Sequence, residues 1–167
     1  MADMWVGVNG ADEALRQVNA EMLGGARALA DQAAAQVVAI VWGASAAGHA
    51  KALASWGADR VVIVESEAAP APEAVARTLA RLAAESAPAV VLLADGAESR
   101  VAAPLLAEAL DAPLFSDVVD IEAGDEVFFT RLPYTAKVIE RATAAAPTVV
   151  ATALGAAVGA SRPAVDE

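Results

Sequence analysis

The sequence of 167 residues predicts an α/β fold in which a mainly parallel sheet is covered by helices. Short apolar, β-branched runs alternate with long alanine-rich segments of helical period, which is the pattern of strand–helix–strand units. The runs are apolar throughout instead of alternating with polar residues, as expected for strands covered on both faces. A chain of this length suits one globular domain and is too short for two well-developed ones.

Four runs in the first hundred residues are the predicted parallel strands. They comprise residues 4–8, 37–42, 61–64 and 90–93. The segment after the first run is the predicted first helix, because its apolar residues recur at spacings of three and four and so line one face. These residues are Leu15, Val18, Met22, Ala26 and Leu29.

Glycine and proline mark the ends of three further predicted helices. The second helix spans roughly residues 46–56 and stops at Gly57, a suitable C-cap. The third lies between Pro72 and Pro88, since proline is favoured at the start of a helix and restricts the residue before it. The fourth spans roughly residues 99–110.

After Pro113 the pattern changes to short strand-like pieces with turn residues between them, which predicts an antiparallel addition to the sheet. The pieces comprise residues 114–121, 126–131 and 134–139. A last strand, residues 148–152, is expected to return to the parallel part. We therefore assign residues 1–155 to one domain and residues 156–167 to a flexible tail or linker.

The composition excludes several classes of function. With no cysteine and one histidine, the sequence predicts no disulfide framework, no metal site and no thiol chemistry, so redox work would need a borrowed cofactor. A formal net charge of -11 argues against a nucleic-acid partner, because affinity for phosphates rests on Lys and Arg. The acidic surplus is interpreted as a solubilising surface.

Neither a membrane span nor secretion is expected. The most apolar stretch, residues 144–160, is broken by proline and glycine and is shorter than the roughly 20 apolar residues of a spanning helix. The first residues carry Asp3 in place of the basic region of a signal peptide. We therefore expect a cytoplasmic protein.

Residues 43–50 nearly match a phosphate-binding P-loop, with Gly43 and Gly48 at the required spacing. The match fails where the chemistry needs it, because His49 and Ala50 replace the lysine and the hydroxyl residue of that loop. A plain turn from strand to helix is the preferred interpretation. His49 has no carboxylate or second histidine in register, so no catalytic residue is assigned.

The best candidate for a pocket is the segment after the fourth strand, where parallel sheets usually bind ligands. Gly96, Ser99 and Arg100 are the candidate cofactor-binding residues. Asp95 and Glu98 would repel a phosphate, however. The simpler alternative is a capped helix with Ser99 as N-cap and Arg100 paired with a nearby acid.

Arg131 and Tyr134 lie in the predicted addition to the sheet, where loops gather, and are the candidate partner-binding residues. The alternative is an arginine satisfied within the domain and a packed tyrosine. The three tryptophans, Trp5, Trp42 and Trp56, are interpreted as core and rim packing and not as a flavin stack.

Six stretches together resemble the N-terminal domain of electron transfer flavoprotein alpha subunits. They include Gly57-Ala-Asp-Arg-Val61, Ser116-Asp-Val-Val-Asp120 and Thr130-Arg-Leu-Pro-Tyr134, in the family's order and spacing. In full, the stretches comprise residues 21–30, 54–64, 100–107, 112–120, 130–134 and 147–152. The sequence departs from the family pattern at residues 99–101, at Thr135 and Ala136, where the family has glycines, and at residues 153–155.

The resemblance implies a Rossmann-like three-layer fold of the adenine nucleotide alpha hydrolase type. It also implies a scaffold role in electron transfer from dehydrogenases to an acceptor, without catalytic residues of its own. The family holds FAD in a C-terminal domain that this sequence does not contain, which implies either an excised domain or a natural short form whose other half is separate or lost. In both cases we expect that the chain does not bind FAD alone. A beta-type subunit, in which AMP is possible, and FAD-domain or dehydrogenase partners are implied.

Two other interpretations stay open. One is a small adenine-nucleotide module of the universal stress type, using the crevice beyond Leu93, although Gly96 lacks the glycine and serine or threonine that such proteins place after it. The other is a structural homo-oligomer. The sequence does not identify the electron donor or acceptor.

Overall fold

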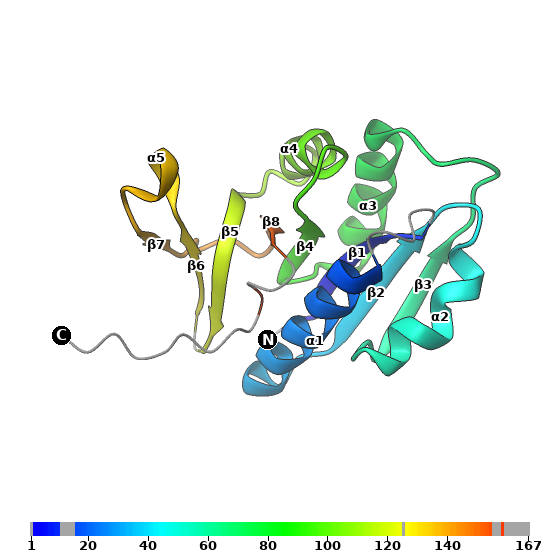
Figure 1. Cartoon of the computed structure of the whole chain (residues 1–167), viewed down its shortest axis with the longest axis horizontal. Coiled ribbons are helices and arrows are strands. Elements are labelled where there is room, and N and C mark those ends of the chain that lie inside the picture. Colours follow the sequence, from blue (N-terminus) through cyan, green and yellow to red (C-terminus); the bar gives the residue numbers. More distant parts are fainter. Residues whose placement is uncertain (1, 11–15, 125, 155–157, 159–167) are drawn as a thin grey trace.

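An eight-stranded sheet runs through the part of the chain that the computed structural model describes, namely residues 2–10, 16–124, 126–154 and 158 (Figure 1). Its strand order is β3-β2-β1-β4-β8-β5-β6-β7. Neighbouring strands from β3 to β5 are parallel, and the pairs β5–β6 and β6–β7 are antiparallel. The predicted fold class is therefore confirmed, including the antiparallel addition.

The parallel strands have the bounds that the apolar runs predicted, to within one or two residues. They are β1 (Met4–Asn9), β2 (Val37–Trp42), β3 (Arg60–Val64), β4 (Val90–Ala94) and β8 (Val149–Ala153). Four helices connect or follow them: α1 (Arg16–Ala33), α2 (Ala46–Ser55), α3 (Pro72–Ser86) and α4 (Ser99–Ala109). Beyond α2 the chain turns at Gly57, whose φ of 121° suits a residue without a side chain.

Two apolar cores lie on opposite faces of the sheet. Residues of α1 and α2 pack against one face, with Met22, Leu23 and Leu53 fully buried. Residues of α3 and α4 pack against the other, with Leu79 and Leu106 buried. Strands buried on both faces need no polar alternation, which explains the continuous apolar runs of the sequence.

The chain changes direction across the sheet between β1 and β4. From β1 it proceeds to β2 and β3 on one side, and then crosses to β4 on the other side. The loops that follow β1 and β4 therefore leave in different directions at their carboxyl ends. In open α/β sheets a crevice forms at such a switch point.

The antiparallel addition consists of β5 (Leu114–Ala123), β6 (Val127–Arg131) and β7 (Glu140–Ala142). The predicted strand over residues 134–139 is wrong. This segment begins with the short turn α5 (Pro133–Ala136), in which Tyr134, Thr135 and Ala136 have φ values of 55°, 58° and 61°. Pro133 has no amide proton for a sheet ladder, so the strand does not resume until Glu140.

A bulge in β5 accounts for the position of Asp117. Its φ is 55°, a left-handed value that Asp tolerates better than most residues. The register of β5 against β8 shifts between Phe115 and Val118, and the Asp117 amide donates to the Thr152 hydroxyl at 3.1 Å. The Ser-Asp-Val stretch is thus a bend in the strand beside β8.

Val158 is the one described residue beyond Leu154. It is 5% exposed and forms a parallel bridge with Ile121. The rest of the proposed tail, residues 156–167, lies outside the described residues, so the division at residue 155 stays a prediction. Within the described residues, no helix is both long and apolar enough to cross a membrane.

Candidate functional site

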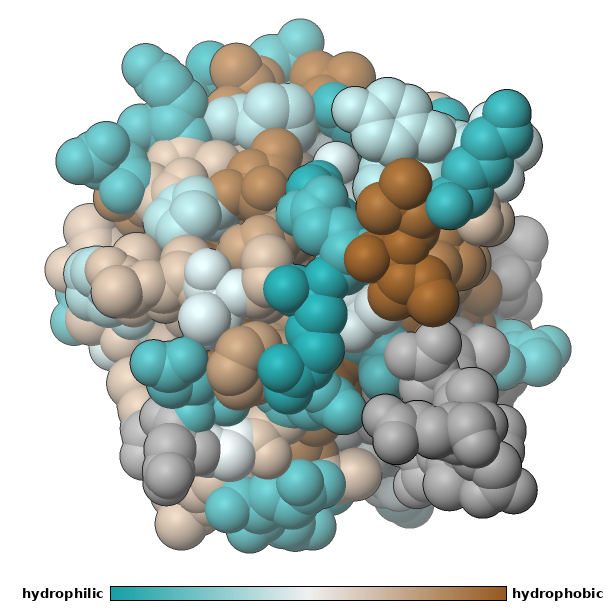
Figure 2. Space-filling model, turned by 90° about the vertical axis from the view of Figure 1, so that its left-hand side faces the viewer, coloured by the Kyte–Doolittle hydropathy of each residue, from teal (hydrophilic) through white to brown (hydrophobic). Residues whose placement is uncertain are grey.

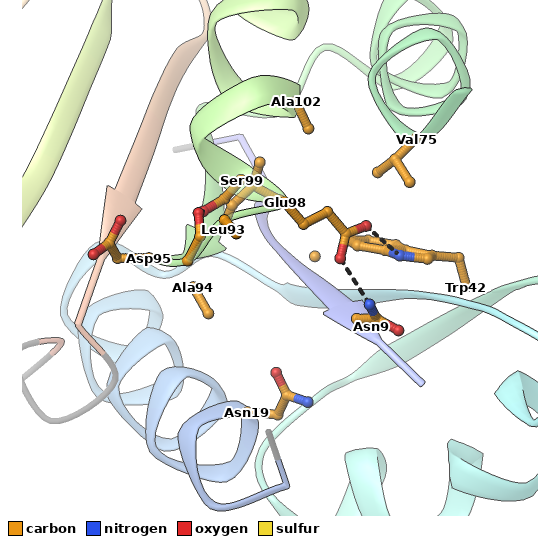
Figure 3. Close-up of a pocket in the computed structure, with 13 residues that line it drawn as sticks. Asn9, Asn19, Trp42, Val75, Leu93, Ala94, Asp95, Glu98, Ser99 and Ala102 are labelled. Carbon is orange, nitrogen blue, oxygen red and sulfur yellow. Dashed lines mark hydrogen bonds between the residues drawn. The ribbon is translucent and has the colours of Figure 1, made fainter. Parts of the chain in front are cut away.

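A crevice of about 290 Å³ opens at the switch point, at the carboxyl ends of β1, β2 and β4 (Figure 3). Its walls are mostly apolar and come from both the sheet and the helices α3 and α4. The wall residues are Gly7, Trp42, Val75, Leu93 and Ala102. Its polar groups include Asn9 at the end of β1, Asn19 on α1, and Glu98 in the loop between β4 and α4.

The wall at β1 requires a glycine. A Cβ atom on Gly7 would lie 2.4 Å from Cδ2 of Leu93 and 3.0 Å from Cη2 of Trp42. The absence of a side chain thus lets the indole of Trp42 extend from β2 over β1. Trp42 is 6% exposed, so its predicted role in core and rim packing is confirmed, and its ring also lines the crevice.

Glu98 joins three elements of the crevice. Its Oε2 accepts a hydrogen bond of 2.7 Å from Nδ2 of Asn9, and its Oε1 accepts one of 3.0 Å from Nε1 of Trp42. Both donors lie at the ends of neighbouring parallel strands (Figure 3). The carboxylate therefore lies where a bound anion would otherwise meet these donors.

Gly96 and Ser99 line the crevice, as predicted for a pocket at this segment. The prediction of Ser99 as N-cap is wrong, because α4 begins at Ser99 itself and Glu98 occupies the cap position without a side-chain cap bond. The Ser99 hydroxyl donates to the Gly96 carbonyl at 3.0 Å. A hydroxyl within a helix commonly bonds back to the preceding turn in this way.

Arg100 is directed away from the crevice and pairs with Asp95, as the alternative interpretation predicted. Its Nη2 lies 3.2 Å from Oδ2 of Asp95, and its side chain is 68% exposed. The hydrogen bond to Asp95 raises the pKa of Arg100 above its ordinary value, and the charge of the same carboxylate adds to this effect. Among the described residues that line the crevice there is no lysine or arginine.

The P-loop-like segment forms the turn between β2 and α2 together with the first residues of α2, as expected. Residues 43–50 do not line the crevice. Among the described residues, no group of three metal-ligating side chains is found.

Arg131 is held within the domain and does not form a free docking group. Its Nη2 contacts both carboxylate oxygens of Glu140 at 2.7 and 2.8 Å, which links β6 to β7. Its guanidinium also lies 5.8 Å from the ring centre of Phe115, which stacks on Phe129 at 4.6 Å. Tyr134, by contrast, is 78% exposed, so the alternative of a packed tyrosine is wrong.

Sequence reasoning missed the grouping of Asn9, Asn19, Trp42 and Glu98. Asn9 ends a strand and Glu98 precedes a helix, which are positions where ligand-binding residues often occur in parallel sheets. That signal places each residue at the correct edge of the sheet. It does not indicate that Glu98 turns toward the indole of Trp42.

The comparison with known proteins agrees with this architecture. A family model described as "Electron transfer flavoprotein domain" matches residues 4–166. The chain belongs to this family. The predicted resemblance is thereby confirmed.

Several curated relatives are named electron transfer flavoprotein subunit alpha. The protein of Mycobacterium tuberculosis (strain CDC 1551 / Oshkosh) is 38% identical over 130 residues, which cover 74% of this chain and 39% of the relative. That of Syntrophomonas wolfei is 32% identical over 156 residues, which cover 91% of this chain and 48% of the relative. That of Mycobacterium leprae is 36% identical over 126 residues, with 74% and 39% covered. The chain thus spans less than half the length of these relatives.

The crevice does not suit the FAD that the family name implies. Its volume of about 290 Å³ lies just below the range of about 300–1,000 Å³ typical of small-molecule sites. A diphosphate also needs cationic or amide donors, and here the donors of Asn9 and Trp42 are bonded to Glu98. No step of flavin chemistry is therefore assigned to these residues.

Proposed function

We infer that this domain is a scaffold subunit of an electron transfer flavoprotein, which braces a beta-type subunit while FAD is held elsewhere in the complex. The observation that carries this proposal is the Glu98 carboxylate, which takes up the donors that a nucleotide phosphate would need. The domain keeps the nucleotide-type sheet without its phosphate site. It acts as an electron-carrier subunit without catalytic residues of its own.

The proposed docking surface for the beta-type subunit is the segment from Leu132 to Ile139, called the 132–139 turn. Four of its side chains are large, apolar and exposed: Leu132 (39%), Tyr134 (78%), Val138 (47%) and Ile139 (58%). Figure 2 looks onto this side of the molecule and shows hydrophobic side chains gathered beside hydrophilic ones. Apolar groups that cluster at a sheet edge are typical of a protein interface.

The backbone holds this turn in a fixed shape. Three consecutive residues, Tyr134 to Ala136, have left-handed φ values between 55° and 61°, each of which costs about 1–2 kcal/mol for a residue with a side chain. The ion pair of Arg131 and Glu140, in which Nη2 donates to both carboxylate oxygens, closes the turn at its base. A preorganised loop loses less entropy on binding, which favours a docking role. In this proposal Tyr134 contacts the beta-type subunit, and Arg131 stabilises the turn that carries it.

Binding between the purified chain and the beta-type subunit of the same organism tests this proposal. Tyr134→Ser and Ile139→Ser are each expected to weaken the complex by about ten-fold or more, as loss of a buried apolar anchor does. Val101→Ser is the matched control, because Val101 is 42% exposed but lies on α4. It is expected to change the affinity by no more than about two-fold.

Two results would contradict the proposal. One is equal weakening by the control and the turn variants. The other is a stoichiometric FAD complex of the purified chain alone, measured by its flavin absorbance. Electron transfer from a dehydrogenase to an acceptor, and AMP in the beta-type subunit, then remain properties of the assembled complex to be assayed there.

A further inference from the structure

The helices α3 and α4 present their outer sides to solvent together. They pack against each other and cover the same face of the sheet (Figure 1). Helices in such contact have axes about 8–10 Å apart, so a single partner helix can touch both. We call the exposed residues Arg77 and Arg81 of α3 and Val101, Pro104 and Leu105 of α4 the α3–α4 face.

The α4 part of this face is apolar. Val101 is 42% exposed and Leu105 is 41% exposed, and a spacing of four places them on one side of the helix. Each lies two positions from the buried Ala103, which is a rotation of about 200° and directs both side chains away from the sheet. Pro104 between them is also exposed. Apolar side chains that adjoin on a surface are typical of a contact with another molecule.

The α3 part of this face is basic. Arg77 and Arg81 are exposed, and neither forms an ion pair or a hydrogen bond with a residue that the structure describes. Like charges four positions apart destabilise a helix. Five other arginines do pair with carboxylates: Arg27, Arg60, Arg100, Arg131 and Arg141. In a chain with a formal net charge of -11, two adjacent cations without a carboxylate indicate a partner that supplies one.

The order of charges along α3 disfavours a second copy of this chain and a membrane. Glu73, Arg77, Arg81 and Glu85 follow one another at spacings of four and are all exposed. When two copies of α3 meet antiparallel about a twofold axis at their centres, Glu73 faces Glu85 and Arg77 faces Arg81, which are like charges. The flanking carboxylates also repel anionic lipids, which attract clusters of cations. An acidic protein surface fits the central arginines.

We propose that the α3–α4 face binds an acidic amphipathic helix of a partner protein other than the beta-type subunit. Apolar side chains of that helix pack on Val101 and Leu105, and its carboxylates pair with Arg77 and Arg81. The spacing of four within both pairs matches the spacing of side chains along one side of a partner helix. The α3–α4 face shares no residue with the 132–139 turn, so its role does not depend on the proposed scaffold role.

Fluorescence anisotropy on the full chain with two labelled peptides tests the class of partner. The first is a capped helix of about 18 residues with leucines along one side and glutamates beside them, and the second has glutamines in place of the glutamates. The acidic peptide is expected to bind about ten-fold more tightly than the glutamine peptide at about 0.05 M salt, and the difference should shrink at about 0.5 M salt. No binding of the acidic peptide at millimolar concentration, or equal affinity for both peptides, would overturn the proposal.

Single substitutions test the two parts of the face. Arg81→Gln is expected to lower the preference for the acidic peptide about three-fold or more. Its matched control is Lys51→Gln, because Lys51 is an exposed cation on α2, which covers the opposite face of the sheet. Leu105→Ser is expected to weaken both peptides about ten-fold with the preference retained. Its control is Ile63→Ser, because Ile63 is also 41% exposed but lies on the edge strand β3. Equal effects of a variant and its control contradict the role of that residue.

Other occupants of the face give distinct results. Self-association of the chain that Leu105→Ser abolishes, measured by analytical ultracentrifugation, would assign the face to a second copy. Tighter binding to vesicles that contain phosphatidylglycerol than to the acidic peptide would assign it to a membrane. Either result overturns the proposal. Val101→Ser should weaken the acidic peptide and spare the beta-type subunit, and Tyr134→Ser should do the reverse, so failure of one surface is distinguishable from failure of the other.

Discussion

Two neighbouring glycines of α1 are expected to respond in opposite directions to the same substitution. Gly24 is exposed, and a Cβ atom there would meet nothing within 4 Å. A Cβ atom on Gly25 would lie 2.0 Å from the carbonyl oxygen of Val158. That distance is far below ordinary van der Waals contact and involves backbone, so one of the two segments must move.

The magnitudes follow from the structure. Gly24→Ala is expected to raise the free energy of unfolding by about 0.5–1 kcal/mol, since alanine restricts the unfolded chain and favours the helix. Gly25→Ala has the same helical gain but displaces Val158, which is 5% exposed. Losing the burial of a valine costs roughly 1.5–3 kcal/mol. The net effect of Gly25→Ala is a loss of about 0.5–2.5 kcal/mol of the free energy of unfolding.

Thermal unfolding followed by circular dichroism measures the difference. A domain of this size shifts its Tm by about 2–4 °C per kcal/mol, so the two variants should differ by roughly 3–12 °C. A chain that ends at residue 154 lacks Val158, so a Cβ atom at position 25 has no such neighbour. In that chain Gly25→Ala should raise the free energy of unfolding as much as Gly24→Ala does. Equal stabilisation by both substitutions in the full chain would refute the packing of Val158 against α1.

Three further predictions concern stability. The hydrogen bond from the amide of Val37 lowers the pKa of Asp59 in the folded chain. The ionised carboxylate therefore stabilises the fold at neutral pH, and this contribution is lost as the pH falls below about 4. Asp59→Asn should make the free energy of unfolding depend less on pH in that range. Arg131→Lys removes the guanidinium whose Nη2 donates to both carboxylate oxygens of Glu140 and which lies over the Phe115 ring, and should lower the free energy of urea unfolding by about 1 kcal/mol. Thr135 has a φ of 58°, which glycine adopts without strain, so Thr135→Gly should raise the free energy of urea unfolding by about 1 kcal/mol.

Each of these has an outcome that contradicts it. If the free energy of unfolding of Asp59→Asn falls below about pH 4 as steeply as that of the wild type, the folded chain does not lower the pKa of Asp59. Wild-type stability in Arg131→Lys means that the clamp between β6 and β7 contributes little. A less stable Thr135→Gly means that the left-handed turn depends on the threonine side chain.

The strands and helices were predictable because their signals are local. Apolar runs and helical spacing reflect burial by whichever neighbours the element has, and Gly57 and the prolines end elements by their own backbone limits. The resemblance of six stretches to the electron transfer flavoprotein family is of the same kind, since it needs only order and spacing. Family membership and fold class were both correct on this basis.

The errors lie where distant parts of the chain compete. Residues 134–139 have the composition of a strand, but Pro133 and the pair of Arg131 with Glu140 close a left-handed turn there instead. Ser99 has the character of an N-cap, yet the residue is only 6% exposed and its hydroxyl bonds back to Gly96. In each case a contact specific to this fold outweighs the local preference of the residue.

By itself the sequence determined a layered α/β domain, its family and the lack of a lysine-bearing phosphate loop, because these depend on residue type and spacing along the chain. Tertiary structure decided that Asn9, Trp42 and Glu98 meet in one crevice and that Tyr134 is exposed while Arg131 is not. Asn9 and Glu98 are separated by 89 positions, and Trp42 and Glu98 by 56. Their contact depends on the order of the strands in the sheet and on the missing side chain of Gly7. Neither can be inferred from the residues that adjoin Asn9, Trp42 or Glu98 in the sequence.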